Sequence, residues 1–377
     1  MRCFKLIFIL FFTCLNLFFS GSAEAQNYKK IEKKMKFWMK WYHIPGAQCS
    51  IIKSGEIKAS FAFGNTTFKG QTKVSHQSLF QGGKINQLYT ALSLLKELSD
   101  NTLSNKKSIS EQLKHYQLRQ SSVNEGTETF PLDLLTHSSG INRPNFKVLN
   151  TEFSPSTLEL LQGSERLESK KIHHFQTPRK SYLYSEGAFV LARALIEQCS
   201  GSDLSQYWAN GLNTVLDNEL ILGASPARAV QGYRNSKSAV QSSLFYPNYS
   251  GYGAWISSSD YAKLLIKLID KQFFIKEFDL KSSYYDLLFT PVMHIKNTKY
   301  SSCAVFEKNE FKSEVFRLCS RRDGFRSYAY LDLTNNEGLV LLMSSEMDYF
   351  FSEKKDKLEK KLNKIFKKHG LFEQIEL

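Results

Sequence analysis

Thirteen residues decide the fold of this chain: Leu79–Ala91, with the sequence LFQGGKINQLYTA. From Ile85 onward apolar residues recur at intervals of three and four, which predicts a buried amphipathic helix that begins near Lys84. Many enzymes place a nucleophile where a glycine pair leads into such a helix, because free N–H groups and the helix dipole favour negative charge there. The residue after Gly83 is an amine, so the stretch has the scaffold of a catalytic helix without a hydroxyl or thiol at its start.

Four further segments follow this stretch along the chain. They are Leu134–Ile141 (LLTHSSGI), Tyr184-Ser185-Glu186 followed by Gly187, Ser257–Ala262 (SSSDYA) and Gly324–Ser327 (GFRS). Together with the glycine-led helix, they resemble the ordered motifs of the serine β-lactamase and penicillin-binding-protein family, in its class C β-lactamase and esterase-like branch. The resemblance covers about residues 28–365. It implies an α/β (α+β) fold of the β-lactamase type, in which an antiparallel sheet is flanked by terminal helices and carries an inserted all-helical subdomain.

The expected organisation is a signal peptide over residues 1–25 and one domain over residues 26–377. We expect the sheet part at about 28–70 and 235–370, and the helical part at about 80–230. The expected elements are a basic helix over 28–42, a hairpin of strands 47–53 and 57–63, a helix over 259–271, strands over 303–307, 315–319, 327–333 and 339–344, and a basic helix over 354–368.

The first motif departs from the family pattern at its two chemical positions. In the family it reads roughly Phe-x-x-Gly-Ser-x-x-Lys-x-x-Thr-Ala, which places Lys84 at the nucleophile position and Gln87 at the position of the lysine base. Acyl transfer needs an oxygen or sulfur nucleophile whose proton a nearby base accepts. A mostly protonated amine and an amide supply neither, so no catalytic residue is expected at these positions.

The second and third motifs also depart from the pattern. Tyr184 is retained, but Glu186 replaces a neutral asparagine with a group that only accepts hydrogen bonds when ionised. We expect Glu186 to form an ion pair with Lys84 where the two come close, and its carboxylate to repel anionic substrates. The resemblance places the third motif at Leu318-Cys319-Ser320, where neither the basic group nor the glycine is present. Arg321 or Arg322 could supply the missing charge.

Three functional interpretations stay open from the sequence. In the first, the chain is a non-catalytic homologue whose former active-site cleft, with Lys84, Gln87, Tyr184, Glu186, Arg321 and Arg322, binds a small molecule, a peptide or an envelope component. In the second, it is a divergent serine hydrolase of the esterase, amidase or peptidase type that uses a relocated nucleophile such as Ser138, Ser139 or Ser185. In the third, it interacts with the cell envelope through its basic surface alone. The sequence does not indicate an oligomeric state.

No cofactor, metal or nucleic-acid site is expected. His173-His174 is the only adjacent histidine pair, and neighbouring residues seldom point at one ion without further ligands. The net charge of +14 is scattered over the chain apart from the lysine-rich helices over residues 29–40 and 354–368, and no nucleic-acid motif accompanies it.

The first residues are typical of an export signal. Arg2 and Lys5 precede an apolar run over residues 6–19, and Ala23-Glu24-Ala25 is a small-x-small cleavage site. The run is shorter than the roughly 20 residues of a membrane span, and no second stretch is long and apolar enough for one. We therefore expect a bacterial protein that is exported to the periplasm or the exterior, without a transmembrane segment after cleavage.

Four cysteines remain after residue 25, and two of them are expected to pair. Cys303 and Cys319 are equidistant from Phe311, the middle of a predicted hairpin turn. In a symmetric hairpin they face each other across the two strands, where a disulfide can form. Cys49 and Cys199 are expected to be separate buried thiols.

Overall fold

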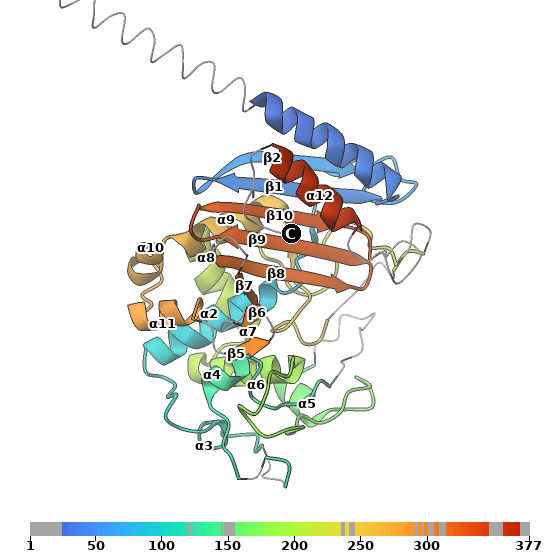
Figure 1. Cartoon of the computed structure of the whole chain (residues 1–377). Helices are drawn as coiled ribbons and strands as arrows, with labels where there is room; N and C mark the ends of the chain where they lie inside the picture. Colours follow the sequence, from blue (N-terminus) through green and yellow to red (C-terminus); the bar gives the residue numbers. More distant parts are fainter. Residues whose placement is uncertain are drawn as a thin grey trace, which may run out of the picture. The chain divides into compact units, whose positions relative to one another are not determined.

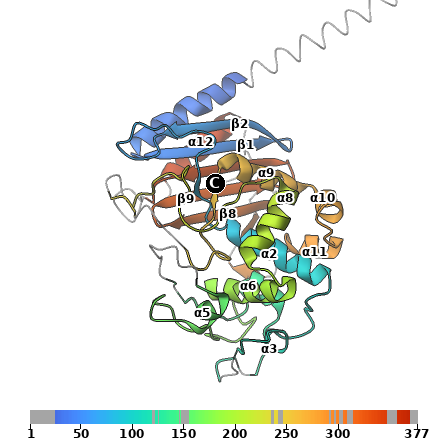
Figure 2. The ribbon, with the colours of Figure 1, turned by 180° about the vertical axis from the view of Figure 1, so that it is seen from behind.

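The computed structural model describes residues 25–118, 122–124, 126–144, 146, 155–234, 238–240, 246–290, 293–295, 298–300, 305–308, 314–346 and 357–369 (Figures 1 and 2). The described chain forms two compact units. One unit combines the two ends, residues up to His43 and from Asp348 onward, and the other runs from Ile44 to Met347.

The larger unit contains an antiparallel sheet in the order β2-β1-β10-β9-β8-β7-β6-β5 (Figure 1). The strands are β1 (Gly46–Lys53), β2 (Glu56–Gly64), β5 (Met293–Ile295), β6 (Thr298–Tyr300), β7 (Val305–Lys308), β8 (Glu314–Arg322), β9 (Phe325–Asp332) and β10 (Glu337–Met343). The first hairpin is paired with the last strand, with Ala47 opposite Met343. The predicted hairpin and the predicted antiparallel sheet are therefore confirmed.

A tight turn makes β8 longer than its predicted range of 315–319. The strand continues to Arg322, and β9 starts at Phe325, so only Asp323 and Gly324 connect them. Both have positive φ, at 46° and 85°, which is the geometry of a two-residue turn that matches the twist of an antiparallel pair. Arg321 and Arg322 therefore lie on the end of a strand.

The predicted hairpin between β7 and β8 has the expected register. Val305 pairs with Arg317 and Lys308 with Glu314, as a turn centred on residue 311 requires. Cys303 lies outside the described residues, so its bridge to Cys319 stays a prediction. Cys49 is buried and Cys199 is partly buried, and neither forms a disulfide.

Between β2 and β5 the described chain consists of helices, connecting loops and two short strands. The helices are α2 (Ile85–Ser99), α3 (Ile109–Gln112), α4 (Pro131–Leu135), α5 (Thr157–Gln162), α6 (Glu186–Ser200), α7 (Leu204–Tyr207), the π-helical turn η1 (Trp208–Leu212), α8 (Asn213–Leu216), α9 (Ser258–Ile269), α10 (Lys271–Lys276) and α11 (Ser282–Leu287). The short strands β3 (Phe80–Gln81) and β4 (Trp255–Ile256) pair with each other.

The helix that the sequence predicts from Lys84 is α2, and it forms the centre of the larger unit. All of its residues except Lys96 are buried, and it contacts α4, α6, α11 and η1. Helix α9, predicted at 259–271, packs on β1, β2 and β10 (Figure 2). The core therefore encloses α2, and the N-terminal end of that helix opens onto a cavity.

The smaller unit contains two basic helices. One runs over residues 25–41, and apolar residues four apart (Ile31, Met35 and Met39) are buried. The other is α12 (Lys357–Lys368), in which Ile365 and Phe366 are buried. Residues 1–24 of the predicted signal peptide lie outside the described residues. Within the described part of the chain, no helix has both the length and the apolar character that a bilayer crossing requires.

Candidate ligand-binding cleft

A cavity of about 230 Å³ opens at the N-terminal end of α2. Five parts of the chain meet there: the start of α2, the loop that contains Arg143, the start of α6, the segment before β4 and the end of β8. The residues that line this cleft are Lys84, Arg143, Tyr184, Glu186, Tyr252, Cys319, Ser320, Arg321 and Arg322. It therefore contains Lys84, Tyr184, Glu186, Ser320, Arg321 and Arg322 of the residues named from the sequence, and lacks Gln87 and Leu318.

Gly83 fixes where the cleft begins. Its φ is +70°, a conformation that favours glycine, and a Cβ atom there would lie 2.5 Å from Cβ of Ser320 and 2.3 Å from Oγ of Ser327. Only a glycine lets the chain pass this close to β8 and β9. The next residue, Lys84, is consequently held beside β8 as the N-cap of α2.

The Lys84 ammonium has neither a hydrogen bond nor an ion pair among the described residues. Its Nζ lies 5.3 Å from the centroid of the Tyr184 ring. Burial lowers the pKa of Lys84 from its ordinary value of 10.5, and the guanidinium groups of Arg317 and Arg143 act in the same direction. The predicted ion pair between Lys84 and Glu186 is therefore wrong.

Glu186 is paired with arginines instead. Its Oε1 accepts a hydrogen bond from Nη1 of Arg322 at 2.7 Å and lies 3.8 Å from Nη2 of Arg143. The Arg322 guanidinium reaches this position because β8 extends beyond its predicted end. It also packs over the rings of Tyr252 and Tyr246, at 5.1 and 5.5 Å from their centroids.

Positive charge exceeds negative charge around the cleft. Its lining has four cationic side chains (Lys84, Arg143, Arg321 and Arg322) and one carboxylate. Two carboxylates just outside the lining, Asp323 and Glu346, approach Arg322 and Arg321 at 3.2 and 3.9 Å. Lys84 keeps an unmatched charge even when both are counted. The sequence led us to expect that the Glu186 carboxylate repels anions. Because Glu186 is paired with Arg322 and cations are in excess, this expectation loses its basis.

Gln87 lies beneath the cleft and holds Tyr184. Its Nε2 donates to the Tyr184 hydroxyl at 2.9 Å, and its side chain is buried. Burial raises the pKa of Tyr184 to about 12, so this hydroxyl stays neutral at physiological pH. An amide that donates to a neutral phenol orients the ring but accepts no proton from a nucleophile.

The segment around His137 contacts the residues at the start of α6 that line or adjoin the cleft. His137 Nδ1 accepts a hydrogen bond from the backbone N–H of Ser185 at 3.3 Å, and its ring lies 4.7 Å from that of Tyr184. Burial, together with the positive charge of Lys84, lowers the pKa of His137 to about 3. The imidazole is therefore neutral at physiological pH, as an acceptor must be.

The serines that the sequence offered as relocated nucleophiles do not line the cleft. Ser138, Ser139 and Ser185 are all buried. The Ser185 hydroxyl donates to the Asn142 carbonyl at 2.7 Å and caps α6, and the Ser138 hydroxyl bonds to that of Thr136 at 2.7 Å. The hydroxyl of Ser320 does line the cleft, where it donates to the Tyr252 hydroxyl at 3.3 Å.

Sequence reasoning missed two lining residues, Arg143 and Tyr252. Arg143 follows the LLTHSSGI segment by two positions, and its guanidinium lies 5.1 Å from the Tyr184 ring centroid. Tyr252 belongs to the tyrosine- and glycine-rich segment Tyr246–Gly253. That composition was the available signal, because aromatic rings with polar tips beside flexible glycines are common in binding sites.

Hydrogen bonds from α2 and α6 hold the segment that carries Tyr252. Asn86 donates to the Tyr249 carbonyl at 2.6 Å, and Thr90 donates to the Ser250 carbonyl at 2.7 Å. Asn248 donates to the backbone carbonyl of Glu186 at 3.1 Å. The starts of both helices therefore fix this wall of the cleft.

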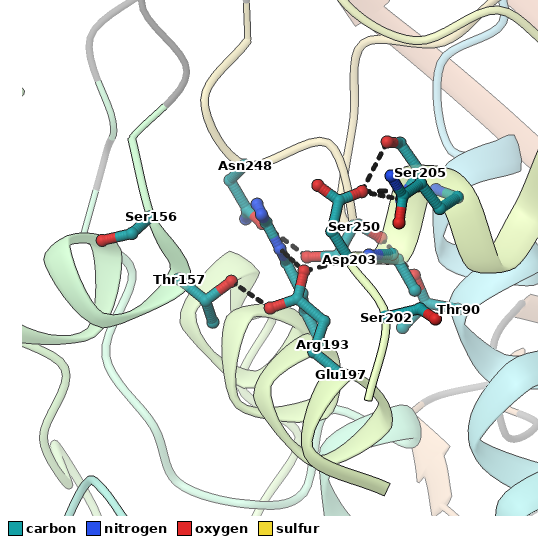
Figure 3. A network of polar contacts seen from close by, with 12 residues as sticks. Thr90, Ser156, Thr157, Arg193, Glu197, Ser202, Asp203, Ser205, Asn248 and Ser250 are labelled. Atoms are coloured by element: carbon teal, nitrogen blue, oxygen red, sulfur yellow. Dashed lines mark hydrogen bonds and ion pairs between the residues drawn. The ribbon is translucent and has the colours of Figure 1, made fainter. Parts of the chain in front are cut away.

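A second buried ion pair lies deeper, on α6 (Figure 3). Arg193 Nε donates to Glu197 Oε1 at 2.7 Å, and the guanidinium stacks on the Tyr249 ring, 4.1 Å from its centroid. Glu197 also accepts from the backbone N–H of Leu204 at 3.0 Å and from the hydroxyl of Thr157. We call Arg193, Glu197, Thr157, Leu204 and Tyr249 the α6 network.

The histidine pair is engaged separately. His173 Nδ1 lies 2.8 Å from the Lys171 carbonyl and His174 Nε2 lies 2.8 Å from the Thr129 hydroxyl. Within the described residues, no three histidine, cysteine, aspartate or glutamate side chains gather in a metal-binding arrangement.

Comparisons with known proteins agree with this fold. A family model described as Beta-lactamase matches residues 29–282. Among solved structures, a class C beta-lactamase has a TM-score of 0.71 and 16% identity, with 91% of this chain and 96% of that chain covered. The D-alanine carboxypeptidase AmpC from Burkholderia cenocepacia has a TM-score of 0.70 and 14% identity, with coverages of 90% and 98%.

Two further relatives complete the comparison. The octameric penicillin-binding protein homologue from Pyrococcus abyssi has a TM-score of 0.68 and 19% identity, with 86% of this chain and 73% of that chain covered. Protein flp from Staphylococcus aureus is 23% identical over 168 residues, which are 45% of this chain and 32% of that protein. The chain thus spans about a third of the length of the curated relatives it matches. At these identities the structures show the fold alone, and the predicted β-lactamase-like fold is confirmed.

Proposed function

Because this chain belongs to the Beta-lactamase family, we propose that it is a non-hydrolytic member whose cleft binds a ligand with a compact anionic group, such as a carboxylate or a phosphate. The main observation behind this proposal is the position of Lys84 at the N-terminal end of α2. It occupies the place where the family pattern has a nucleophile, and its ammonium has no acceptor among the described residues.

The neighbours of Lys84 support binding rather than acyl transfer. Gln87 donates its amide to a neutral tyrosine, so no base lies one helical turn from Lys84. Arg143 and Arg322 flank the same cavity. A carboxylate or phosphate placed between them and Lys84 would accept charge-assisted hydrogen bonds, which are stronger than neutral ones.

Calorimetric titration with inorganic phosphate and with acetate tests the binding proposal. We expect Lys84→Met to weaken anion binding about tenfold, because it removes one charge-assisted hydrogen bond. Lys106→Met, which removes an exposed lysine near α3, is the matched control and should bind like the wild type. Equal affinity of Lys84→Met and the wild type for both anions would overturn the proposal.

A second candidate function rests on Ser320. It is a serine hydroxyl in the cleft that also contains Lys84, so a divergent hydrolase could use it as a relocated nucleophile. Labelling with a fluorophosphonate and with a fluorescent penicillin separates the candidates. We expect no labelling of the wild type; labelling that Ser320→Ala abolishes would establish the hydrolase and refute the non-hydrolytic proposal.

The cellular location and the identity of the ligand belong to the same proposal. Export to the periplasm or the exterior, by the signal over residues 1–25, would expose the cleft to envelope components and peptides as well as to small molecules. Cell fractionation with detection of the mature N-terminus tests the export, and light scattering of the purified chain tests its oligomeric state.

A further inference from the structure

The helix over residues 25–41 has two different sides. Ile31, Met35 and Met39 are buried on one side. The opposite side is exposed, and at 3.6 residues per turn it collects lysines and two aromatic residues along one stripe. These residues are Lys29, Lys30, Lys33, Lys36, Phe37, Lys40 and Trp41. We call them the aromatic–lysine face.

The aromatic residues of this face are unusually exposed. Phe37 is 54% exposed and Trp41 is 64% exposed, and both are among the few large apolar side chains that are exposed in the described chain. Their rings stack on each other with centroids 6.0 Å apart. A helix face that only needs to stay solvated gains nothing from two adjacent aromatic rings.

The charges around these rings have one sign. The helix over residues 25–41 has six lysines and one glutamate, and α12, in the same compact unit, has six lysines and one glutamate as well. The two helices meet where Nζ of Lys361 lies 5.1 Å from the Trp38 ring centroid. Positive charge is therefore concentrated in this unit, whereas the cleft lies in the other one.

Rings and lysines together match a lipid surface. Tryptophan and phenylalanine side chains partition into the interface between headgroups and acyl chains, and lysines beside them are attracted to anionic headgroups. A nucleic acid or an acidic protein would use the lysines but would not require two stacked, exposed aromatic rings beside them. We propose that the aromatic–lysine face binds a bilayer that contains anionic phospholipid. This proposal is independent of the ligand in the cleft.

Vesicle flotation tests the proposal with the full chain. Vesicles of phosphatidylcholine with 30% phosphatidylglycerol, in about 0.15 M salt, should retain the wild type, and pure phosphatidylcholine vesicles should not. Lys33→Gln/Lys36→Gln/Lys40→Gln should weaken binding about a hundredfold, at about fivefold per lysine. Phe37→Ser/Trp41→Ser should weaken it about tenfold or more.

Phe175→Ser is the matched control, because Phe175 is 67% exposed and belongs to the other unit. It should bind vesicles like the wild type. All variants share residues 1–25, so differences among them report on the face alone, and unchanged melting temperatures should show that each variant folds. Equal retention on neutral vesicles, or retention that neither multiple variant weakens, would overturn the proposal. Loss with the lysine variant but not with the aromatic variant would also overturn it, in favour of an acidic macromolecule.

Discussion

Helix α6 carries two glutamates that are each paired with an arginine, and the two pairs differ in what surrounds them. Glu197 pairs with Arg193, and their side chains are 19% and 4% exposed. Glu186 pairs with Arg322, and their side chains are 5% and 21% exposed. The first pair lies in the α6 network (Figure 3), and the second lies in the wall of the cleft.

The difference lies in how the charges are matched. Both oxygens of Glu197 accept hydrogen bonds from within the α6 network, so this pair is complete. Around Glu186 the cations outnumber the carboxylates, and Lys84 has no acceptor among the described residues. A complete pair stabilises the fold, whereas the excess of positive charge beside the cavity is the basis of the proposed anion binding.

The largest effect is expected for Glu197→Gln, which should lower the free energy of unfolding by about 3–5 kcal/mol, because it removes the carboxylate that is hydrogen-bonded to the buried Arg193 guanidinium. Urea denaturation measures this. Thr157→Val is the control, since it removes a single hydrogen bond and should cost about 1 kcal/mol. If Glu197→Gln costs no more than this control, the α6 network does not stabilise the fold as described.

A smaller loss of about 1–2 kcal/mol is expected for Glu186→Gln in the same denaturation experiment, because Arg322 keeps Asp323 as a partner at 3.2 Å. The variant should also bind phosphate more tightly, by about fivefold, because a carboxylate that competes for Arg322 is gone. Weaker phosphate binding by this variant would contradict the assignment of the charge excess to the ligand.

Lys84→Met should slightly stabilise the protein, by about 0.3–1 kcal/mol, because it removes a cation from a helix N-terminus. It should weaken phosphate binding at the same time, so stability and binding change in opposite directions. Arg193→Met is the comparison variant: it should lower stability and leave phosphate binding unchanged. If Lys84→Met instead lowers stability, Lys84 has a structural role.

The smallest effect concerns pH. Burial lowers the pKa of Lys84 in the folded chain below 10.5, so between that lowered value and 10.5 the unfolded chain holds a proton that the folded chain has lost. The contribution of Lys84 to stability therefore rises with pH through this window. Urea denaturation of the wild type and Lys84→Met at stepwise higher pH should show their difference shrinking. A difference that stays constant up to pH 10 would contradict the lowered pKa.

The local part of this picture was predictable from the sequence. The start of α2 near Lys84 followed from apolar spacing after a glycine pair, and the hairpin of β1 and β2 followed from alternation around Ser54-Gly55. The antiparallel sheet and the family also followed, because they depend on motifs that are each short and continuous.

The partner of Glu186 was not predictable, because it depends on one two-residue turn. The turn at Asp323-Gly324 lets β8 continue to Arg322. The Arg322 guanidinium therefore pairs with Glu186, and Lys84 does not. Arg143 and Tyr252 were missed for a related reason. They lie on connecting segments whose positions are fixed by contacts distant in sequence, such as the bond from Thr90 to the Ser250 carbonyl.

The pairing of β1 with β10 has a consequence for the order in which the protein assembles. Ala47 cannot meet Met343 until nearly the whole chain has been synthesised, which takes roughly 17–70 s at about 5–20 residues/s. During that time the first hairpin has one edge without its neighbour, so the nascent polypeptide cannot complete its sheet early. This delay would suit the export proposed above, because an incompletely folded chain can pass through a narrow translocation channel.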